Sequence, residues 1–203
     1  IFQMKKYLLA MALALTASFS ANASYIQGVS GAELAGIEVT VDFLAGGSES
    51  ATWVSTSTTA GGAFGASDWS VTLDGDSFGE FDPSTSTYYG LFEVFASFDI
   101  MSITLDMLGT GLVFDTEYGM ASGNGSGAGR EMVVDLPQYT VTYSNLVEDE
   151  LYSTVTIDGI FEENSVTGFL TDVDAAAEDV PAPAGLALLG LGLLGMRLSR
   201  RNK

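Results

Sequence analysis

Apolar and polar residues alternate with a period of two over much of this chain. The clearest run is residues 37–43, in which isoleucine, valine and phenylalanine alternate with Glu38, Thr40 and Asp42. Because successive side chains of a strand point to opposite faces, this run predicts a strand with one packed face and one face in water. Similar patterns predict strands at 52–56, 69–73, 88–98, 102–107, 112–115, 132–134, 139–143, 151–157 and 165–170.

Glycine-rich turn signals separate these runs. They lie at residues 45–47, 61–62, 74–76 and 158–159. About ten short strands joined by such turns predict an all-β fold, either an antiparallel β-sandwich or a jelly-roll. We expect residues 24–171 to form this domain, with Trp53 and Trp69 in its core.

The N-terminal end has the three parts of a secretory signal peptide. They are a basic pair at Lys5 and Lys6, an apolar stretch over residues 7–19, and a small-residue cleavage pattern at Ala21, Ala23 and Ser24. This order is typical of a segment that signal peptidase removes during export. We therefore expect residues 1–23 to be a signal helix, with the translation start at Met4.

The C-terminal end carries a second three-part pattern. Its parts are a proline segment at Val180, Pro181, Ala182 and Pro183, an uncharged Leu- and Gly-rich stretch at 184–196, and a basic cluster at Arg197, Arg200 and Arg201. The prolines prevent a regular helix through the first part. Thirteen uncharged residues form a helix of only about 20 Å, shorter than the roughly 30 Å bilayer core. This length favours a transient membrane contact over a permanent C-terminal anchor.

This tail resembles the PEP-CTERM sorting signal, which exosortase enzymes of Gram-negative bacteria recognise. Residues 181–183 read Pro-Ala-Pro where that family usually has Pro-Glu-Pro. The resemblance implies that 172–183 are an acidic linker with the sorting motif, and that 184–203 are a hydrophobic sorting helix with a basic tail. It also implies an exported protein at the cell surface or outside the cell, processed by an exosortase-type enzyme and associated with exopolysaccharide or biofilm.

Shorter stretches of the middle region also resemble patterns that recur among exported PEP-CTERM proteins. They lie at residues 46–53, 75–78, 113–115, 140–145 and 169–174. This looser resemblance implies a shared β-sandwich and gives no catalytic residue to carry over. A non-enzymatic surface or matrix protein is therefore the expected function.

The charge of the middle region excludes one class of partner. All 26 acidic residues lie within residues 24–179, where Arg130 is the one base, so this region has a net charge of −25. Nucleic-acid binding requires clustered lysine and arginine to replace counterions on phosphates. We therefore expect no nucleic-acid partner.

The chain contains neither cysteine nor histidine. Sites built from imidazole or thiolate, and catalytic triads that need histidine, are thereby excluded. Carboxylate pairs remain, and Glu93, Asp99, Asp106 and Asp115 lie in or directly next to predicted strands, so a carboxylate-type glycosidase is a distant third function. We expect no enzyme activity and no cofactor other than calcium.

Calcium or sugar binding is the alternative function. Asp74 with Asp76, and Asp172 with Asp174, each offer two carboxylates in a short span, and hard cations prefer such oxygen ligands. Neither pair extends to an EF-hand loop, and solvated turn acids are the simplest interpretation of both. Tyr88 and Tyr89 place one ring on each face of a strand, so one of them is expected to be exposed and able to stack on a sugar.

Overall fold

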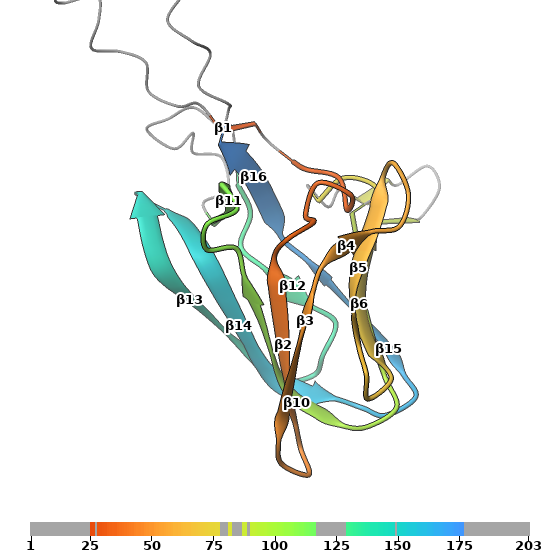
Figure 1. Cartoon of the computed structure of the whole chain (residues 1–203). Coiled ribbons are helices and arrows are strands. Elements are labelled where there is room, and N and C mark those ends of the chain that lie inside the picture. The colour runs from red at the N-terminus through yellow and green to blue at the C-terminus, as the bar shows by residue number, and fades with distance from the viewer. Residues whose placement is uncertain are drawn as a thin grey trace, which may run out of the picture. The chain divides into compact units, whose positions relative to one another are not determined.

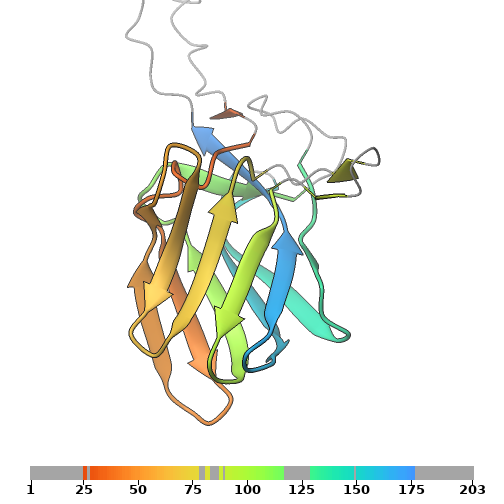
Figure 2. The ribbon, with the colours of Figure 1, turned by 90° about the vertical axis from the view of Figure 1, so that its right-hand side faces the viewer.

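The described part of the chain is a sandwich of two antiparallel sheets (Figures 1 and 2). The computed structural model describes residues 25–26, 28–77, 81–82, 87–88, 90–116, 129–148 and 150–176. The predicted all-β sandwich is confirmed. Within these residues, no helix has the length and apolar character needed to cross a membrane. The expected signal and sorting helices lie outside the described residues.

The larger sheet has eight strands. In spatial order its main path is β1 (Tyr25–Ile26), β16 (Asp172–Ala176), β11 (Leu112–Asp115), β14 (Leu151–Phe161), β10 (Ile100–Asp106), β2 (Glu38–Phe43) and β3 (Ser48–Thr52). The eighth strand, β13 (Tyr139–Glu148), pairs with β14. Both β10 and β11 pair with β14, β10 along residues 154–161 and β11 along residues 151–152.

The smaller sheet has six strands and faces the viewer in Figure 2. Its order is β12 (Val133–Val134), β15 (Val166–Leu170), β9 (Phe92–Ala96), β6 (Trp69–Asp74), β5 (Ala60–Gly65) and β4 (Val54–Ser55). A separate two-stranded ribbon consists of β7 (Phe81–Asp82) and β8 (Thr87–Tyr88).

The chain passes directly from one sheet to the other at two single residues. Trp53 joins β3 of the larger sheet to β4 of the smaller one, and Thr171 joins β15 to β16 in the opposite direction. Both residues are buried. Because each connection is only one residue long, these crossings restrict how the two sheets can move relative to each other.

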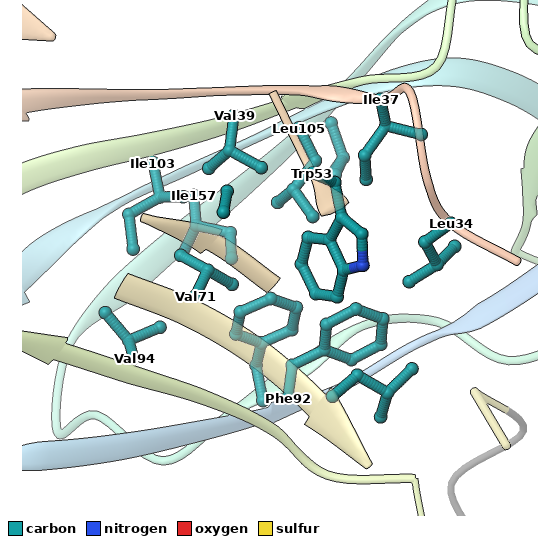
Figure 3. Close-up of a cluster of buried hydrophobic side chains, with 14 of the residues drawn as sticks. Leu34, Ile37, Val39, Trp53, Val71, Phe92, Val94, Ile103, Leu105 and Ile157 are labelled. Carbon is teal, nitrogen blue, oxygen red and sulfur yellow. The ribbon is translucent and has the colours of Figure 1, made fainter. Parts of the chain in front are cut away.

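The core fills the space between the sheets, and Trp53 lies at its centre (Figure 3). Trp53 is 1% exposed, and its ring meets the Phe92 ring edge-on with 6.0 Å between the ring centroids. Phe92 in turn stacks on Phe169, with 4.8 Å between their centroids. The indole N–H of Trp53 donates a hydrogen bond of 2.7 Å to the carbonyl of Gly31. The predicted core roles of Trp53 and Trp69 are confirmed, since both are buried.

Two of the predicted turns are wrong, because Gly61 and Gly159 lie inside strands β5 and β14. Gly61 is required for a close approach, since a Cβ there would meet the Trp53 nitrogen and the Gly31 carbonyl. In β5, glycine is needed because another part of the chain packs against it. Sequence rules for turns do not distinguish such a glycine from one that allows a bend. The predicted turn at 45–47 is present between β2 and β3, where Gly46 and Gly47 both have a φ of 95°.

The sandwich extends beyond its expected end at residue 171. Residues 172–176, which we expected to begin a linker, form β16 between β1 and β11. The expectation was wrong because two aspartates in five residues indicated a solvated segment, whereas both are buried in the fold.

We predict that Trp53→Phe destabilises the fold more than Trp69→Phe. Both changes remove similar apolar volume, but Trp53→Phe also leaves the buried Gly31 carbonyl without its donor, which costs about 1–3 kcal/mol. The indole N–H of Trp69 makes no hydrogen bond of good geometry, although the Glu49 carboxylate interacts with it, so less is lost there. Urea unfolding followed by circular dichroism measures both variants, and equal losses of unfolding free energy would contradict the role given to the Trp53 hydrogen bond.

Candidate functional site

Strands β11 and β16 run side by side (Figure 1), and three aspartates of this pair lie together. Asp115 is opposite Asp172 in this antiparallel pair, and Asp174 lies two residues further along β16. Because side chains alternate along strands, Phe114 and Val173 point into the core while the three aspartates share the other face.

The three carboxylates are fully enclosed. Asp115, Asp172 and Asp174 are each 0% exposed, and one oxygen from each lies within 4.8 Å of the others. Charges of one sign at such spacing, removed from water, repel each other strongly unless a proton or a cation intervenes. We call these three residues the aspartate cluster.

A fourth acid, Asp76, approaches the cluster from the turn after β6. This turn is held to the segment before β2, since Ser30 bridges to Asp76 and the Gly31 amide donates to the Gly75 carbonyl at 2.9 Å. Ser77 continues the contact, because its hydroxyl donates to the Val173 carbonyl of β16 at 3.2 Å. Asp76 is itself exposed at this edge of the cluster, and its charge adds to the upward shift in the pKa of Asp172.

Gly28 lies between Asp76 and Asp174. Its amide donates to Asp174 Oδ1 at 3.2 Å, and a Cβ on it would collide with the Asp76 carboxylate. Its φ of 69° is also in the left-handed region that favours glycine. Glycine at this position therefore keeps space between two carboxylates.

Gly129 makes a second close approach, on the side of β11. A Cβ at this residue would overlap the Asp115 carboxylate and lie 2.7 Å from its backbone carbonyl carbon. The following amide, of Arg130, donates to the Asp115 carbonyl at 3.1 Å. The cluster is thus bordered by two glycines from distant parts of the sequence.

The surroundings raise the pKa of Asp172 to about 8. Burial is the main cause, followed by the charges of Asp174, Asp115 and Asp76, in that order. The Val173 amide opposes the shift slightly, but neither oxygen of Asp172 has a hydrogen-bond partner of good geometry. The carboxylate of Asp172 therefore requires either a proton or a bound cation.

The structure rearranges the two aspartate pairs that the sequence singled out. Asp74 and Asp76 are both exposed, but Asp76 lies against Gly28, whose amide donates to Asp174, whereas Asp74 accepts a hydrogen bond from the Thr59 hydroxyl at 3.2 Å. From the sequence, Asp115 was considered only for a glycosidase pair and was not connected with Asp172 and Asp174. The signal for the strand that pairs with it was the alternation Asp172-Val173-Asp174, which suits a strand as well as a linker.

A shallow hollow of about 310 Å³ lies on the smaller sheet. Polar groups reach it from Thr56, Thr72, Asp74 and Glu93, and its border includes Gly90 and Leu91. Tyr88 belongs to β8, whereas Tyr89 lies outside the described residues, so the placement of the two rings stays a prediction.

The expected processing residues lie outside the described part of the chain. These are the cleavage residues Ala21, Ala23 and Ser24, and the tail residues Val180, Pro181, Ala182, Pro183, Arg197, Arg200 and Arg201. A comparison with protein families bears on the second group, since residues 179–202 match the family model of the PEP-CTERM protein-sorting motif.

The chain carries a PEP-CTERM sorting motif. The motif implies an exported, cell-surface protein that an exosortase-type enzyme processes. The match covers the proline segment, the uncharged stretch and the basic cluster, although alanine stands at position 182. No curated protein and no solved structure matches the chain.

Asp172 gives the folded protein a pH dependence of defined sign. Its pKa of about 8 in the fold exceeds the ordinary 3.8, so between these values the folded chain holds a proton that the unfolded chain releases. The free energy of unfolding therefore falls as the pH rises through this window, by up to about 1.4 kcal/mol per pH unit. Below about pH 4 both states are protonated and this group contributes nothing.

We predict that Asp172→Asn removes this component, because asparagine cannot ionise. In chelator-treated protein, the stability of Asp172→Asn relative to the native chain should increase steadily from pH 5 to pH 8. Thermal unfolding at several pH values measures this difference. A difference that stays constant over the range would contradict the raised pKa.

Proposed function

We propose that this protein is a non-enzymatic structural component of the cell surface or of an exopolysaccharide-rich extracellular matrix. The observation that carries the proposal is the sorting motif at residues 179–202, which follows directly on an acidic β-sandwich. Export with surface sorting is the common feature that this motif implies. Association with polysaccharide or biofilm is the further step that we propose.

The residue inventory supports a role without catalysis. The chain has no histidine or cysteine, and the group of three carboxylates found within 4.8 Å of one another in the described residues is fully buried. A glycosidase needs two carboxylates that flank a bound sugar, so it needs acids that the substrate can reach. Acids with 0% exposure do not meet this requirement.

The charge of the domain supports a place among hydrated polymers. A net charge of −25 over residues 24–179 favours solubility and opposes self-association and contact with anionic surfaces. Such a domain can remain dispersed in a polysaccharide matrix after its tail has been processed.

The tail offers a direct test of sorting. We predict that the native chain in its host loses residues 1–23 and the basic tail, and is recovered from the surface or matrix fraction. Replacing Arg197, Arg200 and Arg201 with glutamine should prevent retention and processing, because these cations hold the tail on the cytoplasmic side. Lysine at the same three positions is the matched control and should preserve both.

Cell fractionation and intact-mass measurement read out this prediction. Full-length protein inside the native host would contradict the proposal, as would equal processing of the glutamine variant. The matrix role has its own readout, since a strain that lacks the gene should lose cohesion of its aggregates. The native gene should restore cohesion, and the glutamine variant should not.

A sugar-binding module is the second candidate, favoured by the hollow on the smaller sheet. Hydroxyl and carboxylate groups of Thr72, Asp74 and Glu93 line it, and such groups bind sugar hydroxyls. A panel of oligosaccharides separates the candidates. Binding that Glu93→Gln and Tyr88→Ala abolish, and that the exposed-site control Glu163→Gln keeps, would favour the module, whereas a scaffold should bind no oligosaccharide through this hollow.

A further inference from the structure

We propose that Asp115, Asp172 and Asp174, with Asp76 at their exposed edge, form a calcium-binding site that fastens the last strand of the sandwich. This inference goes beyond the proposed surface or matrix role and does not depend on it. The site joins β11, β16 and the turn after β6, three elements far apart in the sequence.

The spacing of the aspartate cluster suits a single calcium ion. Calcium binds oxygen ligands at 2.3–2.6 Å, so two oxygens on one ion can be separated by at most about 4.6–5.2 Å. One carboxylate oxygen from each of Asp115, Asp172 and Asp174 lies within 4.8 Å of the others. All three oxygens can therefore share one ion with small adjustments of the side chains.

The side chain of Asp172 gives independent support for a bound cation. Its side chain is completely buried, and neither of its oxygens has a hydrogen-bond partner of good geometry. Buried carboxylates in proteins are normally paired, hydrogen-bonded or bound to a metal. Asp172 shares its face of the sheet with Asp115 and Asp174, so its unmet bonding capacity lies at the cluster itself.

The two bordering glycines let the backbone approach two carboxylates of the site more closely than any other residue could. A Cβ at Gly28 would collide with the Asp76 carboxylate, and one at Gly129 would overlap the Asp115 carboxylate. The two residues come from segments about 100 positions apart, yet both leave room beside a carboxylate of the same site.

The ligand chemistry selects calcium among the common ions. Four carboxylates are hard oxygen ligands, which suit calcium and magnesium rather than softer metals. Magnesium usually keeps several of its waters, whereas the three fully buried carboxylates of Asp115, Asp172 and Asp174 favour an ion bound mainly by protein oxygens. Extracellular calcium modules bind with a Kd of about 10⁻⁴–10⁻³ M, and an exported protein meets calcium in this range.

The site has a structural consequence at the end of the domain. β16 ends at Ala176, and the matched sorting motif begins at residue 179. A bound ion neutralises the carboxylates between β11 and β16, so calcium adds to the stability of the last strand against the sandwich.

The experiment uses protein purified from its native host, treated with chelator and then dialysed. Isothermal calorimetry should detect one calcium ion per chain. With calcium a hundredfold above Kd, the melting temperature should rise by about 5–10 °C. Equal concentrations of magnesium, and sodium chloride of equal ionic strength, should raise it less, which separates binding from screening of the acidic surface.

Two variants locate the ion, and a third is their matched control. Asp172→Asn and Asp76→Asn should each weaken calcium binding at least tenfold and reduce the melting shift. Asp74→Asn removes an exposed acid two residues from Asp76, and it should bind as the native chain does. If one cluster variant fails to fold, the other variant and the native stoichiometry still decide the matter.

Several results would overturn the proposal. One is the absence of calcium binding by the native protein, which would mean that the cluster is neutralised within the chain, by protons or by Arg130. Others are native-like binding by both cluster variants, an equal loss in Asp74→Asn, or equal shifts with calcium and magnesium in every variant. The last two results would indicate nonspecific attraction to the acidic surface.

Discussion

The repulsion between Asp115 and Asp172 is the constraint on which the end of this fold depends. The two residues face each other across paired strands, with Asp174 beside them and no exposed surface to spread the charge. The opposite face of the same strands carries Phe114 and Val173, which are committed to the core. The strands cannot turn the acids outward without losing that packing, so the charge must be neutralised in place.

The two crossings between sheets explain why these acids are held so rigidly. Thr171 connects β15 and β16 without a loop, so the packing of Phe169 in the core also fixes the register of Asp172. Trp53 provides the matching crossing on the other side and anchors Gly31, which lies near the turn that carries Asp76. The same strands and crossings therefore position both the hydrophobic core and the aspartate cluster.

Much of the fold can be predicted from local sequence patterns, whereas the aspartate cluster depends on which strands pair with each other. Alternation located strands such as β2 and β6, and it placed both tryptophans in the core. It failed at β5, where glycines allow another segment to pack closely, and at β16, where two buried aspartates gave the sequence the composition of a solvated linker. Asp76 and Asp115 join Asp172 through long-range register, which no local spacing encodes. The sorting motif was predictable because it is read as a continuous sequence.

The most direct measurement is a crystal structure of the protein grown at neutral pH with calcium, with anomalous diffraction recorded at a long wavelength. The account predicts one anomalous peak between the carboxylates of Asp115, Asp172 and Asp174, with oxygens at about 2.3–2.6 Å. A map without a peak there, in which Asp172 shares a proton with a neighbouring carboxylate, would contradict it.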